Sequence, residues 1–476
     1  MANDIKIKTP TIFTIFGASG DLAKKKLLPA LLDLYVRNLL PKKFRIVGFA
    51  LDDYSDATYR KFVRRAIANN KHGHLRAKVK AFLKNIHYEQ GLFENVEAYT
   101  NLTARISGIE KEYNACANIF LYLAVPPKVY AIVLKNLKKS KLTVSCVGGK
   151  SWMRVLVEKP FGRDLKTARE LNTKLKTLFI EEQIFRIDHY LAKETVQNLL
   201  SFRFSNTLFE SAWDKDYIER VEIKLREKKG IEGRERFYDD VGAFRDVGQN
   251  HMLQLLALVA MEYPGKLEAD TVRKKRAAIL EALTPLTGKT ISQNSIQGQY
   301  IGYRGKRGVP QDSTTETYFK IKTFINDERW KGIPFYLESG KRLGETKTKI
   351  TIYLKKAQCL CAPEFEKPHQ NRIVFRIQPN EGISVVFWVK KPGFTMELEE
   401  KKLTFYYHET EPLLKLPDAY EKVLYDCLRG DQTLFASTRE VEASWKFISP
   451  IIKKWNTEPP LLYKQGSYGP SKRLTF

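Results

Sequence analysis

The sequence lacks a hydrophobic run long enough to cross a lipid bilayer. Its most apolar segment, residues 252–261, is too short to span one and is interrupted by Gln254, so it predicts a buried helix. The N-terminus does not show the basic-then-apolar order of a secretory signal peptide. We therefore expect a protein of the cytoplasm that has no membrane partner.

Cysteine is scarce, with five residues in a chain of 476. Their spacing matches neither a disulfide framework nor a zinc site shared with histidine, and Cys359 and Cys361 lie too close together for a usual zinc knuckle. We expect five reduced thiols, as in a reducing compartment, and no bound metal.

Acidic residues are outnumbered, because 54 Asp and Glu stand against 81 Lys and Arg, which gives a formal net charge of +27. Such a charge favours either nucleic acid or small anions, such as sugar phosphates and nucleotides, as partners. The lysines are scattered along the chain, without a basic tail or an aromatic-basic repeat. This distribution favours a basic enzyme surface, and we expect no specific nucleic-acid binding.

A chain of this length is too long for one compact core and predicts two domains. Early strands are short, apolar runs typical of a buried parallel sheet, whereas later strands alternate as in antiparallel sheets. We predict a Rossmann-like α/β dinucleotide-binding domain over residues 1–185 and an α+β domain with a large, mainly antiparallel sheet over residues 186–476. The predicted strands are 11–16, 45–50, 118–125 and 152–157 in the first domain, and 217–223, 350–354, 373–377 and 383–389 in the second.

A glycine-bearing loop joins the first predicted strand to a helix. Glycine lets the backbone approach a pyrophosphate, and the helix N-terminus supplies unpaired N–H groups. The pattern also fits an ordinary turn between a strand and a helix, but this context favours dinucleotide binding. The predicted cofactor-binding residues are Gly17, Ala18, Ser19, Gly20, Asp21 and Leu22.

The second strand is followed by Leu51, Asp52 and Asp53, at the place where a dinucleotide presents its adenosine ribose. An acid at this place suits a free ribose 2′-hydroxyl and opposes a 2′-phosphate.

Lys159 follows the strand at 152–157, and open α/β sheets bind ligands at the carboxyl ends of their strands. A cis bond to Pro160 is one way to aim this lysine inward. The alternative is a surface lysine on a turn.

Residues 188–193 gather an acid, an imidazole, a phenol and an ammonium group. If the chain is helical from Tyr190 onward, His189 and Lys193 share a face. With Tyr190 they would form a clamp for a phosphate dianion. The alternative is a solvated helix start with an ordinary ion pair.

A second polar stretch, residues 239–251, leads into the apolar segment at 252–261. Asp246 and Gln249 resemble a capping box, so one interpretation makes Asp246 a helix cap and His251 a satisfied helix residue. The other makes His251 a general base whose partner acid raises its basicity and fixes its tautomer. The local pattern favours the first interpretation.

Taken in order, these stretches resemble the glucose-6-phosphate dehydrogenase family of oxidoreductases. The resemblance runs from the Gly17 loop to YKQGSYGP at 463–470 and covers nearly the whole chain. Each motif is moderately specific, and the ordered set is very specific. The motifs are EKPFG at 158–162, RIDHYL at 186–191, RDVGQNH at 245–251, RWKGIPF at 329–335, SGK at 339–341 and QPNE at 378–381.

The resemblance implies oxidation of glucose 6-phosphate at C1 to 6-phosphogluconolactone with hydride transfer to NADP, the first step of the oxidative pentose phosphate pathway. By that similarity His251 is the general base and Asp188 its orienting partner. It also implies a homodimer or homotetramer, with the dimer built on the sheet of the second domain. The implied substrate-binding residues are His189, Tyr190 and Lys193 for the 6-phosphate, Glu227, Asp246, Lys341 and Gln378 for the sugar, Lys159 between substrate and cofactor, and Lys26 from the first domain.

Leu51 departs from the family pattern, because it replaces the arginine that grips the 2′-phosphate of NADP. NADP stays the expected cofactor, with NAD possible as well. Ser19 in the glycine loop or Arg45 could partly compensate for the missing arginine.

Two further positions depart from the pattern. Thr346 replaces a basic residue, so either Lys347 serves in its place or the sugar binds less tightly. Ala192 replaces a glycine, and alanine with a positive φ would cost on the order of 1 kcal/mol. We expect a helical conformation at Ala192, which alanine favours.

Two rival readings stay open. One is a related sugar-phosphate dehydrogenase whose sugar preference has drifted through Thr346. The other is a nucleic-acid-binding protein that uses the +27 charge on a dehydrogenase scaffold. Retention of both His251 and Asp188 favours the enzyme.

Overall fold

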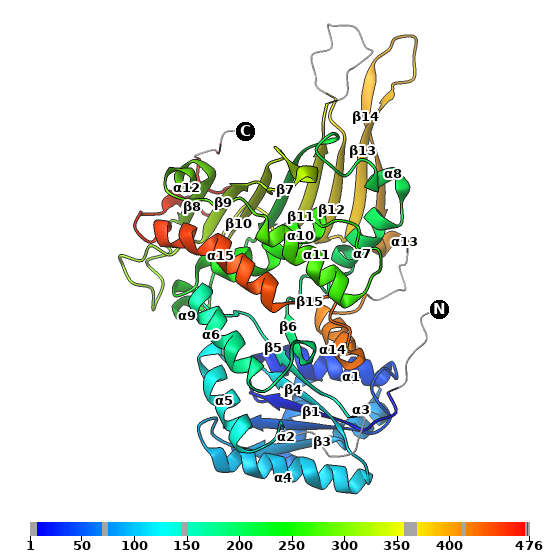
Figure 1. Cartoon of the computed structure of the whole chain (residues 1–476), viewed down its shortest axis with the longest axis vertical. Helices are drawn as coiled ribbons and strands as arrows, with labels where there is room; N and C mark the ends of the chain where they lie inside the picture. The colour runs from blue at the N-terminus through cyan, green and yellow to red at the C-terminus, as the bar shows by residue number, and fades with distance from the viewer. Residues whose placement is uncertain are drawn as a thin grey trace. The chain divides into compact units, whose positions relative to one another are not determined.

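The computed structural model describes residues 7–68, 75–143, 151–356, 369–410, 416–471 and residue 474. The chain divides into two compact units (Figure 1). Unit 1 contains Met1–Gly162, Lys166–Ala192 and Pro417–Thr438, and unit 2 contains Arg163–Leu165, Lys193–Leu416 and Arg439–Phe476.

Unit 1 is built on a seven-stranded sheet with the order β15-β6-β5-β4-β1-β2-β3. Strands β1 to β6 run parallel, and β15 pairs antiparallel with β6. Read from β3 to β6, this is the 3-2-1-4-5-6 order of doubly wound dinucleotide-binding sheets. The strands are β1 (Thr11–Phe16), β2 (Phe44–Ala50), β3 (Ile86–Gln90), β4 (Asn118–Leu123), β5 (Met153–Val157), β6 (Ile184–Ile187) and β15 (Phe435–Ala436).

The central strands of this sheet, β1 and β4, are buried at every position, as expected for parallel strands covered on both faces. A late segment also joins this unit, because α14 packs along α1 and the π-helical turn η1. The helices are η1 (Ala23–Leu27), α1 (Leu28–Val36), α2 (Asp56–Ala66), α3 (Arg76–Leu83), α4 (Val96–Tyr113), α5 (Pro127–Lys139), α6 (Leu165–Lys176), η2 (Glu181–Gln183) and α14 (Ala419–Arg429).

Unit 2 is built on a nine-stranded sheet with the order β14-β13-β12-β11-β7-β10-β9-β8-β16. Its pairs are antiparallel except for β7 with β10 and β8 with β16, which are parallel. The strands are β7 (Ile218–Arg226), β8 (Ser295–Tyr300), β9 (Tyr318–Thr323), β10 (Phe335–Gly340), β11 (Lys347–Leu354), β12 (Arg372–Gln378), β13 (Gly382–Lys390), β14 (Leu398–Tyr406) and β16 (Leu461–Tyr463).

Helices α7, α10, α11 and α15 lie along one face of this sheet (Figure 1). Helix α10 is buried throughout, and two tryptophans tie its end to the surrounding chain. Trp213 Nε1 donates to Val259 O and Trp330 Nε1 donates to Ala260 O, both at 2.8 Å. The helices are α7 (Glu194–Phe204), α8 (Thr207–Glu210), α9 (Glu235–Asp239), η3 (Phe244–Met252), α10 (Leu253–Ala260), α11 (Ala269–Glu281), α12 (Lys289–Asn294), η4 (Glu328–Trp330), α13 (Tyr407–Thr410) and α15 (Thr438–Trp455).

The predicted fold class is confirmed, since an α/β unit with a parallel sheet is combined with a unit built on a mainly antiparallel sheet. The domain boundary expected after residue 185 falls within β6. In the structure the chain passes from unit 1 to unit 2 between Ala192 and Lys193. Residues 417–438 return to unit 1, and a local sequence pattern does not report such long-range pairing.

The expectation of five reduced cysteines is wrong for Cys116, which is disulfide-bonded. Cys427 is a buried free thiol. Cys146, Cys359 and Cys361 lie outside the described residues. Within the described ranges, no helix combines the length and the apolar character needed to cross a membrane.

Candidate active site

The glycine loop of unit 1 follows β1 directly. Gly17 has a φ of 80°, and a Cβ there would come within 2.4 Å of the carbonyl oxygen of Ala124, which follows β4. Gly20 N donates to Gly17 O at 3.0 Å, and a helix begins at Asp21. The loop therefore lies at the carboxyl ends of the neighbouring strands β1 and β4, where the strand order of the sheet reverses, and doubly wound sheets bind nucleotides at this switch point. Its geometry fits a dinucleotide pyrophosphate.

The carboxyl end of β2 is followed by exposed apolar and acidic side chains. The Leu51 side chain is 50% exposed, and Asp52 and Asp53 are exposed beside it. Gln90 Nε2 donates to the Leu51 carbonyl at 3.3 Å. This corner presents an apolar side chain and two carboxylates to solvent.

Arg45 cannot compensate for Leu51, so this expectation is wrong. It lies near the amino end of β2, and the strand between the two residues extends over roughly 20 Å. Its guanidinium donates to Asn85 Oδ1 at 3.0 Å and to Tyr113 OH at 2.7 Å. Ser19, the other residue expected to compensate for the missing arginine, is half-buried in the glycine loop.

Lys159 follows a tightly bound residue at the end of β5. The preceding Glu158 accepts a hydrogen bond from Tyr122 OH at 2.6 Å and another from Tyr420, and Tyr130 OH donates to its carbonyl at 2.9 Å. Burial raises the pKa of the Glu158 carboxyl. The Lys159–Pro160 peptide bond is cis, as predicted.

The chain does not become helical at Tyr190, so that prediction is wrong. Asp188 accepts from Tyr190 N at its Oδ1 and from Leu191 N at its carbonyl, both at 3.0 Å, and these bonds form a turn. Lys193 is the N-cap of α7, with an extended backbone at φ −73° and ψ 138°. Ala192 is neither helical nor among the described residues with positive φ, so alanine is unstrained there.

His189 and Lys26 meet a residue that the sequence analysis missed. The Tyr420 ring stacks on His189 with centroids 6.2 Å apart, and Lys26 Nζ lies 5.9 Å from the same ring. Lys26 also pairs with Asp418 at 3.2 Å. Asp418 caps α14 by accepting from Tyr420 N at 2.9 Å. A proline followed by aspartate signals a helix start, but not where that helix packs.

In unit 2, Glu227 and Lys341 form an ion pair. They follow β7 and β10, a parallel pair in which Arg226 lies opposite Gly340. Because parallel strands end at the same edge, the carboxylate and the ammonium emerge together. Both are partly enclosed, with side chains 29% and 13% exposed.

Asp246 and Tyr238 lie beside this pair. Asp246 Oδ2 is 4.0 Å from Lys341 Nζ, and the same ammonium lies 5.8 Å from the Tyr238 ring centroid. The Tyr238 hydroxyl is buried and has no hydrogen-bond partner among the described residues. Burial, with Asp246 nearby, raises the pKa of Tyr238 well above its usual value. Sequence reasoning named Asp246 but missed Tyr238.

Asp246 is not a helix cap, so the capping-box interpretation is wrong. The N-cap of η3 is Ala243, and its side chain makes no capping bond. Glu316 performs this task from another segment, because its buried Oε1 accepts from Phe244 N at 2.8 Å. Burial raises the pKa of Glu316. Gly242, with a φ of 75°, is needed because a Cβ would lie 2.5 Å from Glu316 Oε1.

The π-helical turn η3 changes which residues share a face. A π-helix closes i→i+5 turns, so Asp246 and His251 lie one turn apart. In an α-helix of 3.6 residues per turn they would differ by about 140°. His251 is 1% exposed, and its backbone N donates to Asn250 Oδ1 at 2.6 Å. The buried imidazole and the Asp246 carboxylate therefore belong to one helix face.

Lys193 contacts a second candidate residue. Its Nζ donates to Gln378 Oε1 at 2.6 Å, and Gln378 is the last residue of β12, against which α7 packs. The Gln378 amide holds the ammonium in place.

Lys347 joins the sheet as the first residue of β11, and Thr346 lies directly before it. Thr346 Oγ1 accepts from Lys228 N at 3.0 Å. Lys347 opens β11 opposite Arg226 and pairs with Glu345 at 3.5 Å.

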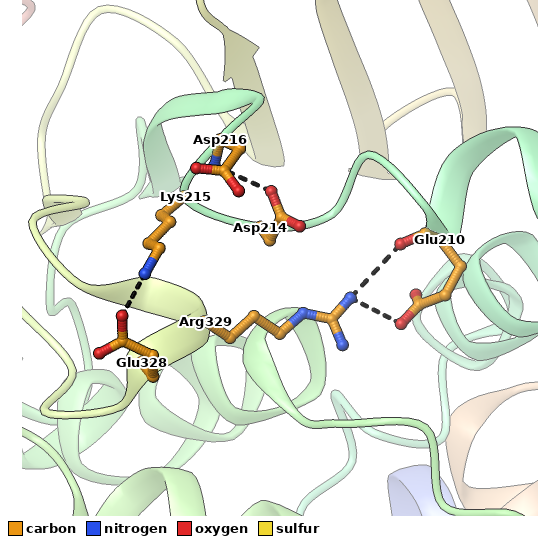
Figure 2. A pocket seen from close by; sticks show the side chains of 6 residues that line it. All are labelled: Glu210, Asp214, Lys215, Asp216, Glu328 and Arg329. Carbon is orange, nitrogen blue, oxygen red and sulfur yellow. Dashed lines mark hydrogen bonds and ion pairs between the residues drawn. The ribbon is translucent and has the colours of Figure 1, made fainter.

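The RWKGIPF segment at 329–335 has a contact network of its own, in a hollow of about 450 Å³ (Figure 2). Arg329 Nη2 donates to Glu210 Oε1 at 2.6 Å, and its Nε donates to Trp213 O at 2.7 Å. Lys215 pairs with Glu328 across the same hollow. Arg329 thus joins η4 to the turn after α8.

Among the described residues, no group of three or more His, Cys, Asp and Glu side chains is arranged to hold a metal ion.

Two family models together match almost the whole chain. The model described as "Glucose-6-phosphate dehydrogenase, NAD binding domain" matches residues 14–198, and "Glucose-6-phosphate dehydrogenase, C-terminal domain" matches residues 200–476.

Individual relatives agree with these models. The chain is 40% identical to a glucose-6-phosphate 1-dehydrogenase of Chlamydia pneumoniae, over 97% of this chain and 93% of that protein. It is 39% identical to the protein of the same name from Caenorhabditis elegans, over 99% and 91%. A solved glucose-6-phosphate dehydrogenase in complex with glucose 6-phosphate superposes with a TM-score of 0.89 at 35% identity, covering 98% of this chain and 96% of that chain.

Proposed function

The chain belongs to the glucose-6-phosphate dehydrogenase family of oxidoreductases acting on CH–OH groups, and we propose that it oxidises glucose 6-phosphate at C1 to 6-phosphogluconolactone, the first step of the oxidative pentose phosphate pathway. The observation that carries the proposal is the polar cluster of unit 2, in which Glu227 and Lys341 pair beside Asp246 on the helix that bears His251.

In this proposal His251 removes the proton of the C1 hydroxyl as general base. When bound, the nicotinamide of NAD(P) accepts the hydride that leaves C1. Asp188 acts as the orienting partner of His251, a role carried over from the family. The carboxylates of Glu227 and Asp246 accept hydrogen bonds from sugar hydroxyls, and Lys341 donates one.

His189, Tyr190 and Lys193 hold the 6-phosphate. Lys193 suits this role because Gln378 orients its ammonium, and an ammonium group binds phosphate oxygens through charge-assisted hydrogen bonds. Lys159 binds between substrate and cofactor, and Lys26 approaches the substrate from unit 1.

Residues 17–22 bind the dinucleotide, and Leu51 faces its adenosine ribose. We propose NADP as the cofactor, as the family resemblance implies. NAD is proposed as a second acceptor, because Leu51 stands where the family has an arginine and the adjacent aspartates disfavour a 2′-phosphate.

Initial rates with glucose 6-phosphate, measured with NADP and NAD in parallel on one preparation, test the proposal. Turnover with both cofactors is expected, and a higher kcat/KM with NAD would assign the preference to Leu51 and its aspartates. A tenfold preference for NADP, about 1.4 kcal/mol, would mean that another donor such as Ser19 binds the 2′-phosphate. No turnover with either cofactor would contradict the proposed activity.

We further propose a homodimer or homotetramer in the cytoplasm, assembled through the sheet of unit 2. In support, one face of that sheet carries interleaved charges, including the pairs Arg220–Glu222, Lys224–Glu222 and Arg226–Glu338. Sedimentation velocity is expected to give two or four times the chain mass of 55.1 kDa. A monomer at micromolar concentration would contradict the assembly while leaving the catalytic proposal intact.

A further inference from the structure

Unit 1 contains a cavity of about 660 Å³ that none of the proposed catalytic or binding residues lines. Its wall is formed by the ends of α1 and α14 and by the start of β2, with Tyr35, Phe44 and Leu428 among the lining residues. The cavity therefore lies at the amino-terminal edge of the parallel sheet. The glycine loop lies at the carboxyl edge, roughly 20 Å away along a strand such as β1.

The wall of this cavity is mainly apolar. Its apolar and aromatic lining residues are Ile7, Tyr35, Leu39, Leu40, Pro41, Phe44, Tyr425 and Leu428. Small-molecule sites are typically hollows of about 300–1,000 Å³ with apolar walls and a few convergent polar groups. The volume and wall of this cavity match that class, and they suit the apolar body of a ligand.

The charged groups at the cavity all have one sign. Lys8, Lys42, Lys43 and Arg429 line it, and no lining residue is acidic. None of the four is ion-paired with a carboxylate of the described chain. Lys43 and Arg429 lie over the aromatic rings of Tyr113 and Tyr425 instead, at 5.7 Å and 5.6 Å.

The helix ends at the cavity reduce this positive field but do not reverse it. α1 and α14 both end there, and a helix C-terminus carries about half a negative charge. The two helix ends together contribute about one negative charge, whereas the four basic side chains contribute four positive charges. An anionic head group is therefore favoured at the rim.

Helix α14 connects the cavity with candidate active-site residues. Tyr425, Leu428 and Arg429, near its C-terminal end, line the cavity. At its other end Asp418 pairs with Lys26, and Tyr420 stacks on His189 and hydrogen-bonds Glu158. The helix is 11 residues long, which corresponds to about 16 Å. A ligand that shifts its C-terminal end therefore acts on residues assigned to the substrate.

We propose that this cavity is an effector site for a free amphipathic anion, a phosphate or carboxylate head on an alkyl or aryl body, coupled to the active site through α14. The coupling rests on the proposed function, whereas the binding does not.

Calorimetric titration of the full-length protein with octyl phosphate, below its micelle-forming concentration, tests the binding. Inorganic phosphate and octanol represent the head and the body alone, and each is expected to bind at least tenfold more weakly. The double variant Lys42→Ala/Arg429→Ala is expected to raise the Kd for octyl phosphate at least tenfold. Lys61→Ala/Arg64→Ala, which removes the same two charges from α2 of the same unit, is expected to change it less than twofold.

Leu40→Trp provides an independent arm, because the indole would fill the apolar part of the cavity. It is expected to raise the Kd at least tenfold. Equal Kd values in the wild type, Leu40→Trp and the Lys42/Arg429 double variant would overturn the site. Displacement of octyl phosphate by NADP would also overturn it, since the ligand would then occupy the nucleotide site. Tighter binding to phosphatidic acid vesicles than to octyl phosphate would overturn the assignment of a free ligand.

The coupling is tested by reciprocity, because linked sites change each other's affinity by the same factor. Saturating glucose 6-phosphate is expected to change the Kd for octyl phosphate at least twofold, and this change is expected to disappear in Tyr420→Ala. An unchanged Kd, in a protein that binds both ligands and turns over substrate, would overturn the coupling. Absence of turnover with intact octyl phosphate binding would instead contradict the proposed function.

Discussion

At the scale of single residues, the proposed chemistry depends on a buried imidazole. His251 is 1% exposed and shares a helix face with Asp246, next to the Glu227–Lys341 pair. In the proposed function those neighbours bind the sugar hydroxyls, so loss of the imidazole should affect proton removal more than sugar binding.

We predict that His251→Asn lowers kcat by at least ~10², the lower end for loss of a general base, and leaves KM for glucose 6-phosphate within about threefold. Steady-state kinetics check this. His408→Asn, at an exposed position on α13, serves as the matched control and should retain full activity. An unchanged kcat in His251→Asn would remove His251 from the role of base.

Leu51 allows a second residue-scale test. A guanidinium at this position would form a charge-assisted hydrogen bond with a 2′-phosphate, which contributes about 1.5–3 kcal/mol. Leu51→Arg is therefore expected to raise the ratio of kcat/KM for NADP to that for NAD by at least ~10-fold. Leu51→Gln, a polar change without charge, should move the ratio by less than threefold. If both variants behave alike, charge at this corner does not select the cofactor.

At the scale of secondary-structure elements, η3 depends on a close approach between Gly242 and Glu316. Gly242→Ala would combine a positive φ with a Cβ 2.5 Å from the buried carboxylate. Gly233 has nearly the same φ, at 79°, but open space around it. The two glycines therefore separate backbone strain from a steric clash.

We predict that Gly233→Ala costs about 1 kcal/mol, the penalty for alanine in this conformation, and that Gly242→Ala costs clearly more. Thermal unfolding midpoints measure the difference, and kcat should fall only in Gly242→Ala because η3 carries His251. Equal effects of the two substitutions would mean that Glu316 can move without disturbing the helix.

Helix α14 predicts a pH dependence through Asp426. Burial raises the pKa of this carboxyl from 3.8 to about 6, despite its ion pair with Lys422. The folded state therefore holds a proton that the unfolded chain has released, and folding is favoured by protonation. The contribution of Asp426 to the free energy of unfolding is therefore highest below about pH 4. It falls by up to ~3 kcal/mol as the pH rises to about 6, because the buried carboxyl must then ionise or keep its proton at a cost.

Asp426→Asn removes the ionised form, so its unfolding midpoint should exceed that of the wild type at pH 8 and match it near pH 4. Thermal unfolding at both pH values measures this. Asp52→Asn, at an exposed site, should change neither midpoint. A lower midpoint for Asp426→Asn at pH 8 would show that the ion pair with Lys422 outweighs the cost of burying the charge.

At the scale of the whole molecule, the net charge of +27 should attract an anionic substrate. We predict that kcat/KM for glucose 6-phosphate, at saturating cofactor, falls at least twofold as the salt concentration rises from ~20 to ~200 mM, because screening shortens the range of the field. Oxidation of glucose, which lacks the phosphate, provides the control and should not respond. If kcat/KM is independent of salt concentration for both sugars, the net charge does not steer the substrate to the enzyme.

Local patterns predicted much of the fold and named most candidate residues. The β1 run was placed at its observed bounds, and glycine at position 17 was identified from its context between a strand and a helix. The helix expected from Tyr190 failed because Asp188 binds the following backbone N–H groups and forms a turn instead. The cap assigned to Asp246 failed for a related reason, since the group that caps η3 comes from Glu316, far away in the sequence.

The sequence by itself determined the family, the two classes of sheet and the residue types of the candidate site, because these follow from hydrophobic periodicity and from ordered motifs. Only the tertiary structure decided which side chains meet. The parallel pairing of β7 and β10 joins Glu227 to Lys341, and the return of α14 to unit 1 places Tyr420 on His189. The same return encloses the basic cavity. Pairing between segments distant in sequence depends on the packing of the whole chain, so a local pattern cannot report it.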